Sequence, residues 1–167
     1  MISYDPWGHY EENPDHTVTA KAVEAACWMA GRKWDYHEHL EAGLEPHAVR
    51  EKYYYARGPQ LVNRVVDVSS TVDTIVRANM ANVTQGPASG NPGATLRRKL
   101  AERGLKLELL GEGDDASADY NYIKHFILRR SRELGKQYGF QYAEKYHYIG
   151  PRDSYVNRFV DENAVPL

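Results

Sequence analysis

A loop that ends in a proline and leads straight into a helix is the feature that most constrains the fold of this chain. Asn13 suits a helix cap because its side chain accepts a backbone hydrogen bond, and Pro14 suits the first turn, where its missing N–H costs nothing. We therefore predict a helix over residues 14–30, ended by Gly31, after a short strand over residues 2–4. The apolar positions that we expect to face the core are Val18, Ala22, Ala25, Ala26 and Met29.

The segments that follow alternate between strand-like and helical patterns. Residues 52–56 and 61–68 are rich in aromatic and β-branched side chains and flank a turn at 57–59, so we predict two strands. Ser69 or Ser70 is expected to cap a helix that runs to Val83. Further helices are predicted over 94–103 and 119–138, whereas residues 33–44 are expected to be irregular. This order predicts a single α/β domain over residues 1–167.

The charge, the apolar runs and the cysteine count limit the classes of partner and the cellular compartment that we expect. The net charge is −2 and the basic residues are dispersed, so we expect no nucleic acid partner. No run approaches the ~20 apolar residues of a membrane span and no signal peptide is recognisable, so we expect no membrane partner and a cytoplasmic protein. A lone cysteine, Cys27, excludes an intramolecular disulfide and is expected to be a packed core thiol.

Short motifs along residues 1–148 resemble, in the same order, those of one enzyme family. They are Tyr4-Asp5-Pro6-Trp7-Gly8, Asn13-Pro14-Asp15-His16, Pro46-His47, Val65-Val66-Asp67-Val68-Ser69, Thr84-Gln85 and Tyr142-Ala143-Glu144. Together they resemble the back half of the LmbE-like (PIG-L type, GlcNAc-PI de-N-acetylase) zinc-dependent deacetylases, in which the second motif reads His-Pro-Asp-His. The resemblance implies a three-layer Rossmann-like fold and a hydrolase that removes an acyl group from an N-acyl amino sugar or a related conjugate.

The first motif of that family, His-Pro-Asp-Asp after the first strand, does not occur in this chain. In the family it supplies two metal ligands and the general base. The resemblance therefore implies either a C-terminal fragment or one subunit of a split enzyme, completed by a complementary N-terminal chain. A half sheet of this kind would expose an edge and an apolar face, so we also expect a homo-oligomer or that complementary chain as a partner. The tail 151–167, which carries Tyr155, Phe159 and Val160, is expected to dock on a neighbouring subunit.

The resemblance assigns roles around the helix start. His16 is the candidate ligand for zinc or another divalent metal, and Asp15 would orient it as a neighbouring carboxylate. Asn13 stands where the family has the histidine that stabilises the oxyanion, and His9, four residues upstream, is a candidate to take over that role. Each also has a plain structural role: a histidine hydrogen-bonded at the helix start, a partner of the helix dipole, a helix cap and a surface loop histidine.

Two other functions remain open from the sequence. A zinc-dependent hydratase of the same superfamily, acting on a small dicarboxylic acid, would gather basic groups around His16, for which Arg32, Arg50 and Arg57 are available. A non-catalytic scaffold subunit would keep the fold for oligomerisation and would bind no metal.

Overall fold

The structure is a computed structural model that describes residues 1–151 and 154–166. Within them the chain is a mixed α/β protein with seven α-helices and one four-stranded sheet. The residues form two compact units, which are described separately: residues 1–64 with 145–166 (unit 1) and residues 65–144 (unit 2). The expectation of a single domain stays a prediction.

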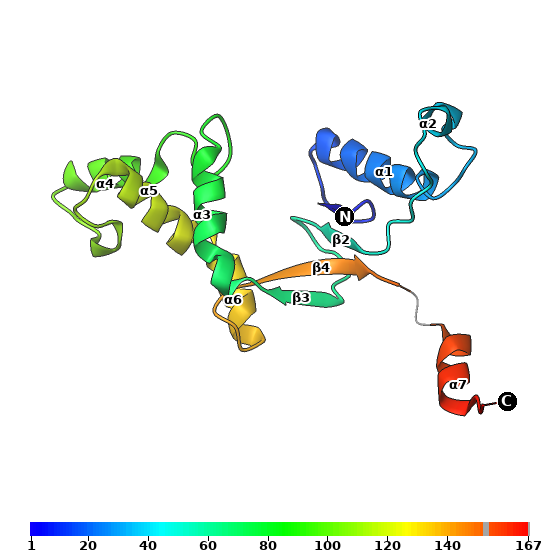
Figure 1. Cartoon of the computed structure of the whole chain (residues 1–167). Helices are drawn as coiled ribbons and strands as arrows, with labels where there is room; N and C mark the ends of the chain where they lie inside the picture. The colour runs from blue at the N-terminus through cyan, green and yellow to red at the C-terminus, as the bar shows by residue number, and fades with distance from the viewer. Residues whose placement is uncertain (152–153, 167) are drawn as a thin grey trace. The chain divides into compact units, whose positions relative to one another are not determined.

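Unit 1 holds most of the sheet (Figure 1). The strands are β1 (Ile2–Tyr4), β2 (Lys52–Tyr55), β3 (Arg64–Asp67) and β4 (Ala143–Ile149), in the order β1-β2-β4-β3. β1 is parallel to β2, with Ser3 opposite Tyr54, and β2 is antiparallel to β4, with Tyr53 opposite Tyr148. The helices are α1 (Pro14–Met29), which packs against β1, α2 (His37–Glu41) and α7 (Tyr155–Asn163).

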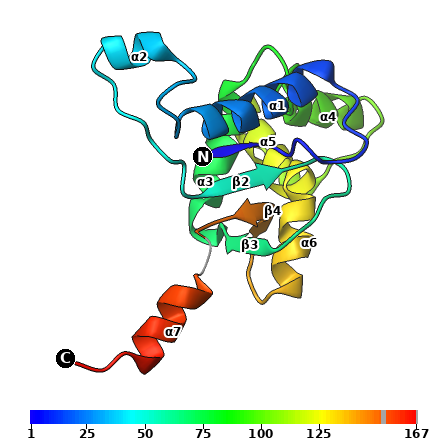
Figure 2. The same cartoon turned by 90° about the vertical axis from the view of Figure 1, so that its right-hand side faces the viewer.

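Unit 2 is mainly helical (Figure 2). Its elements are η1 (Ser69–Thr71), α3 (Val72–Ala81), α4 (Pro92–Ala101), η2 (Glu108–Leu110), α5 (Asp115–Tyr122), η3 (Ile123–Ile127) and α6 (Arg129–Gln137). Val76, Ala88 and Ile123 form its core. Where α4 contacts α5, position 93 requires glycine, because a Cβ there would collide with the backbone of Ala118. None of the helices in the described parts of either unit has both the length and the apolar character needed to cross a membrane.

The helix start was predicted correctly, but the buried face of α1 was not. Asn13 caps the helix by accepting a hydrogen bond from the Asp15 N–H, as expected. The predicted apolar stripe faces outward, and Val18 is 66% exposed. Ala20 is the residue that is fully buried, because the helix approaches the sheet closely along that side. Cys27 is only half-buried, so the expectation of a core thiol was also wrong.

Three further elements differ from the sequence prediction. Residues 33–44 are not wholly irregular, because α2 forms within them. The helix predicted over 119–138 is divided by η3, a π-helical turn between α5 and α6. Ser69 does not cap α3; its hydroxyl instead accepts the backbone N–H of Tyr142 at 3.0 Å and donates to Asp67. The remaining predicted elements exist with ends shifted by a few residues.

Candidate functional site

The loop between β1 and α1 is held by a buried carboxylate. The Asp5 N–H donates to the Tyr55 carbonyl at 2.8 Å, which extends the pairing of β1 with β2 by one residue. The Asp5 side chain, 2% exposed, accepts the Trp7 N–H at 2.9 Å and the Gln60 amide at 3.1 Å. The loop is therefore tied to the strand before it and to the segment after β2.

The turn after β2 supports the same loop from the other side. The His9 N–H donates to the Pro59 carbonyl at 3.3 Å. Only glycine fits at position 58, because a Cβ there would collide with the His9 carbonyl oxygen. This close approach sets the path of the chain from which Glu11, Asn13 and His16 project.

A polar contact anchors α1 to the sheet. Glu24, on the inner side of the helix, accepts two bonds from the Lys52 ammonium, at 3.1 and 3.2 Å, and one from the Tyr54 hydroxyl. Tyr54 is fully buried, and this burial together with the Glu24 carboxylate raises the pKa of its hydroxyl. The position of α1, and with it the position of His16, is thus fixed by an ionic group.

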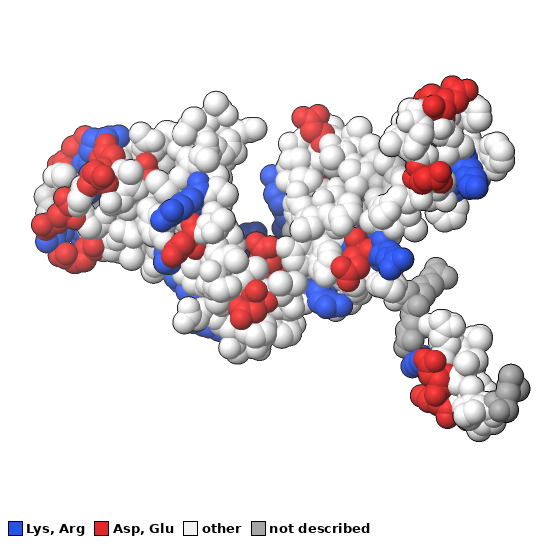
Figure 3. Space-filling model, viewed as in Figure 1, with Lys and Arg blue, Asp and Glu red and all other residues white. Residues whose placement is uncertain are grey.

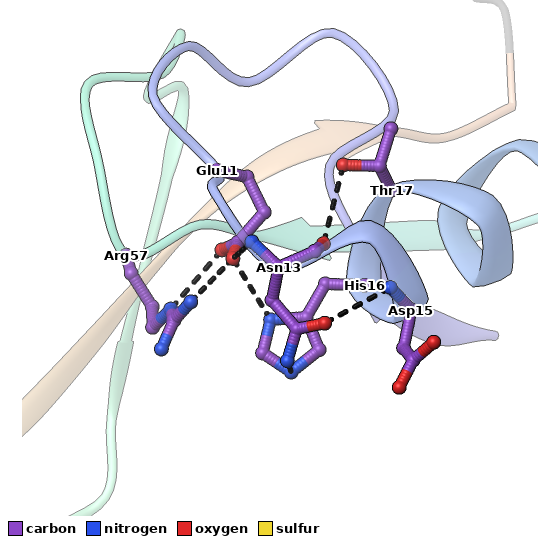
Figure 4. Close-up of polar contacts among 6 residues, drawn as sticks. All are labelled: Glu11, Asn13, Asp15, His16, Thr17 and Arg57. Carbon is purple, nitrogen blue, oxygen red and sulfur yellow. Dashed lines mark hydrogen bonds and ion pairs between the residues drawn. The ribbon is translucent and has the colours of Figure 1, made fainter.

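His16 lies at the centre of a small polar cluster (Figure 4). Its Nδ1 is 3.0 Å from Glu11 Oε1, and its ring stacks on Tyr4 with 4.0 Å between centroids and 15° between planes. Arg57 donates twice to Glu11, once from Nε at 3.1 Å and once from Nη2. The Asn13 N–H also donates to Glu11, at 3.1 Å. The orientation of the imidazole ring is therefore fixed by the contact of Nδ1 with Glu11 and by stacking on Tyr4.

These hydrogen bonds set the ionisation of Glu11. The bond from Arg57 is the main cause that lowers the pKa of Glu11 to about 2, with the Asn13 N–H and His16 adding to it and partial burial opposing it. The same bond raises the pKa of Arg57. Glu11, whose side chain is 13% exposed, is therefore a carboxylate at neutral pH.

The carboxylate in turn determines the tautomer of His16. A carboxylate only accepts hydrogen bonds, so Nδ1 of His16 must carry the proton. In the neutral ring the lone pair then belongs to Nε2. Asn13 faces that atom: its Oδ1 is occupied by the Asp15 N–H, so its amide NH₂ is the end 3.4 Å from Nε2. The site therefore places the Nε2 edge of the imidazole beside an amide donor.

The other sequence-predicted residues are placed differently. Asp15 is exposed, and its carboxylate points away from the imidazole (Figure 4). His9 is exposed, with its ring beside Tyr10. Of the arginines expected for a hydratase, Arg57 joins the cluster while Arg32 pairs with Asp35. The catalytic roles assigned to Asp15, Asn13 and His9 stay predictions.

The sequence analysis missed Glu11 and the role of Arg57. Glu11 lies in an irregular loop five residues before His16, a spacing that has no regular meaning outside a helix, and Arg57 is 46 residues away from it. The one sequence feature that pointed to a carboxylate partner for His16 is the pair of acidic residues, Glu11 and Glu12, that precedes it.

The residues of this site do not by themselves fit a catalytic zinc ion. Such an ion takes three protein ligands and leaves one position for water or substrate. Among the described residues no group of three or more His, Cys, Asp and Glu side chains is placed to hold a metal. The site offers one nitrogen donor, His16 Nε2, since the nearest carboxylate is bonded to the other nitrogen of the same ring.

Comparison with known proteins shows similarity to diacetylchitobiose deacetylases. Over 88 residues the chain is 33% identical to a diacetylchitobiose deacetylase of Thermococcus kodakarensis, a match that covers 52% of this chain and 32% of that protein. The fold is similar to the solved structure of the N,N'-diacetylchitobiose deacetylase from Pyrococcus horikoshii complexed with its inhibitor MPG. That similarity has a TM-score of 0.58 at 17% identity and covers 89% of this chain and 44% of the other. No family model matches the chain. The chain spans about a third of the length of the first relative and less than half of the second.

Proposed function

We propose that this chain is part of a metal-dependent deacetylase of the LmbE-like class, acting on an N-acetylated amino sugar or a related conjugate. In this proposal the chain supplies one ligand, His16, within a three-layer Rossmann-like fold. The remaining ligands and the general base come from polypeptide beyond the described residues, in the same protein or in a second chain. The named relatives are deacetylases of a diacetylated amino-sugar disaccharide, which supports the acyl group and the substrate class.

The observation that carries the proposal is the bond between Glu11 and His16. Histidines that bind metals almost always donate their other ring N–H to a carboxylate, a carbonyl or water, which fixes the tautomer and the ring orientation. Glu11 does this for His16 at 3.0 Å. A histidine that served only to start the helix would need neither the carboxylate nor the stacked Tyr4, because Asn13 and Pro14 already provide the helix start.

The residues of this chain would contribute positioning. A zinc ion, when bound, polarises a carbonyl and lowers the pKa of bound water to about 7. Glu11 keeps the proton on Nδ1, and Arg57 keeps Glu11 ionised. The Asn13 NH₂ group lies 3.4 Å from Nε2, so once a metal takes that nitrogen the amide is placed to donate to a substrate oxygen beside it. Because the donors present do not fit zinc by themselves, no reaction step through the metal follows from this chain alone.

The hydrolase is favoured over the hydratase by the charge of the site. A diacid substrate needs uncompensated cations near His16, but the Arg57 guanidinium is already matched by the Glu11 carboxylate. The hypothesis of a non-catalytic scaffold subunit makes a different prediction. It predicts that no assembly containing this chain takes up zinc through His16.

The test is to co-express this chain with a polypeptide that carries the His-Pro-Asp-Asp motif, and to measure bound zinc and the release of acetate from N,N'-diacetylchitobiose. His16→Ala should abolish zinc uptake, and Glu11→Gln should weaken it by about 10- to 100-fold. His37→Ala, at an exposed histidine in α2, is the matched control and should change neither quantity. Zinc uptake and activity that survive His16→Ala would refute the proposal, and a complex that forms but takes up no zinc would favour the scaffold.

A further inference from the structure

Two exposed tryptophans line a groove along one flank of α1. The groove has a volume of about 510 Å³ and is lined by Trp7, from the loop after β1, and on α1 mainly by Ala25, Trp28 and Met29. Trp28 is 67% exposed and Trp7 is 52% exposed, which is unusual for the largest apolar side chain. In Figure 3 the surface over α1 is largely uncharged. The volume falls within the range of about 300–1,000 Å³ that is typical of small-molecule sites.

Both indole rings are held in place although they are exposed. The Trp7 ring packs edge-to-face against Tyr54, with 5.5 Å between centroids and 78° between planes, and the backbone N–H of Trp7 donates to Asp5 at 2.9 Å. The Arg32 guanidinium lies 5.7 Å from the centroid of the Trp28 ring. Aromatic rings that are fixed in this way lose little conformational entropy when a ligand stacks on them.

Polar groups in the lining add hydrogen-bonding capacity to the groove. Lys21, which is exposed, presents an ammonium group with three donors. Glu24 presents a carboxylate whose orientation is fixed by Lys52 and Tyr54. Of their three bonds, Oε2 accepts two and Oε1 accepts one, so Oε1 retains a lone pair for a further donor. The groove therefore combines flat apolar walls with a donor group and a fixed acceptor.

We infer that this groove binds the rings of an N-acetylated amino-sugar chain, at a second site apart from His16. A pyranose ring of such a chain has an apolar face of C–H groups, which stacks on an indole, and hydroxyl groups at its edge, which bond to Lys21 and Glu24. The methyl groups of the acetamido substituents pack on the apolar lining between the tryptophans. The choice of this ligand rests on the proposed function, whereas binding in the groove requires no metal.

The groove and His16 belong to different sides of α1. Five residues separate Lys21 from His16, which corresponds to about 140° around the helix and about 7.5 Å along its axis. A sugar chain in the groove therefore leaves Nε2 of His16 unoccupied. Because Trp7 and Trp28 offer two linked stacking surfaces, we expect a chain of several sugars to bind more tightly than a single sugar.

The first experiment titrates the full chain, without added metal, with N,N',N''-triacetylchitotriose in a calorimeter. Saturable binding is expected, and the monosaccharide N-acetylglucosamine should bind more weakly. Trp28→Ala removes one stacking surface and Lys21→Ala removes the donor group, so each should raise the dissociation constant by about 2- to 10-fold. The matched control is Trp34→Ala, at a tryptophan that is 80% exposed outside the groove, and it should leave the dissociation constant unchanged.

Three results would overturn the inference. They are the absence of saturable binding, a trisaccharide bound no more tightly than the monosaccharide, and binding that Trp28→Ala leaves unchanged. Light scattering adds a fourth, since a wild-type dimer that Trp28→Ala converts to a monomer would make the groove a contact between copies. Far-UV circular dichroism checks that the variants keep the fold.

The two proposals fail separately. The titration involves neither zinc nor acetate release, so a loss of sugar binding leaves the zinc test of His16 intact. Conversely, trisaccharide binding that depends on Trp28, in a chain whose assemblies take up no zinc through His16, would support the groove and refute the proposed function.

Discussion

The contact of Glu24 with Lys52 and Tyr54 is expected to stabilise unit 1 by holding α1 on the sheet. In Glu24→Ala, the fully buried Tyr54 hydroxyl loses its acceptor and the Lys52 ammonium, on a side chain 16% exposed, loses its carboxylate. A buried polar group left unpaired costs about 1–3 kcal/mol, so the two losses together predict about 2–4 kcal/mol. Tyr54→Phe leaves both bonds from Lys52 to Glu24 and should cost only about 1 kcal/mol.

Urea unfolding followed by tryptophan fluorescence measures these values for the relevant unit. All three tryptophans, Trp7, Trp28 and Trp34, lie in unit 1, so the signal reports on that unit. The transition midpoint should fall at an unchanged slope when all variants are compared at one protein concentration. Glu38→Ala, at an exposed glutamate in α2, is the control and should shift the free energy of unfolding by less than about 0.5 kcal/mol.

The double variant decides whether the contact acts as described. If Glu24→Ala is costly because it strands the hydroxyl, then Tyr54→Phe in that background should cost nothing or stabilise the protein. The coupling energy should then be about 1–2 kcal/mol. Strictly additive effects, or a Glu24→Ala variant as stable as the Glu38→Ala control, would refute the claim that an ionic group fixes α1 on the sheet.

Three predictions concern unit 2. Asp119 accepts the N–H groups of Gly93 and Ala94 at 2.8 and 3.0 Å in a buried position, so Asp119→Ala should cost about 1–3 kcal/mol and speed hydrogen exchange at both amides. Gly93→Ala should lower the melting temperature measured by circular dichroism far more than Gly113→Ala, because its Cβ would strike the Ala118 backbone whereas the nearest atom at Gly113 is 3.6 Å away. The Ser69 hydroxyl lowers the pKa of Asp67, so an NMR titration of Ser69→Ala should show that pKa higher than in the wild type. The lowered pKa of Asp67 stabilises the fold at pH values above the ordinary carboxyl pKa, and this contribution is lost as the pH falls through the lowered value. The stability difference between wild type and Ser69→Ala should therefore narrow at low pH to the part that comes from the lost bond between the Ser69 hydroxyl and the Tyr142 N–H.

Local signals in the sequence were sufficient to place the elements that carry the site. The strand Ile2–Tyr4 and the start of α1 at Pro14 follow from residues within a few positions of one another. Caps and proline positions are properties of the chain itself, so tertiary structure had little to add there.

Contacts between distant residues decided what the sequence could not predict. The inner face of α1 is set by Glu24 with Lys52, 28 residues away, so a search for an apolar stripe selected the opposite face. β4 was missed because Glu144, Lys145 and His147 interrupt an apolar pattern whose strand character lies in its tyrosines, a residue type that favours sheets. A tyrosine-rich strand of this kind is recognisable only once its partner β2, rich in the same residue, is known to lie beside it.

Arg57 is also distant in sequence from the residues that it acts on, since 46 residues separate it from Glu11, and yet it determines the tautomer of His16. His16 can offer Nε2 only if Nδ1 keeps its proton, and Nδ1 keeps it because Glu11 is an acceptor. Glu11 is an acceptor at neutral pH chiefly because Arg57, brought in by the turn after β2, bonds to both of its oxygens. The pairing of β1 with β2 that brings this turn near the loop therefore also selects which nitrogen of a histidine faces outward. A substitution that shifted this register by one residue would leave every residue of the motif in place and still move Arg57 away from Glu11.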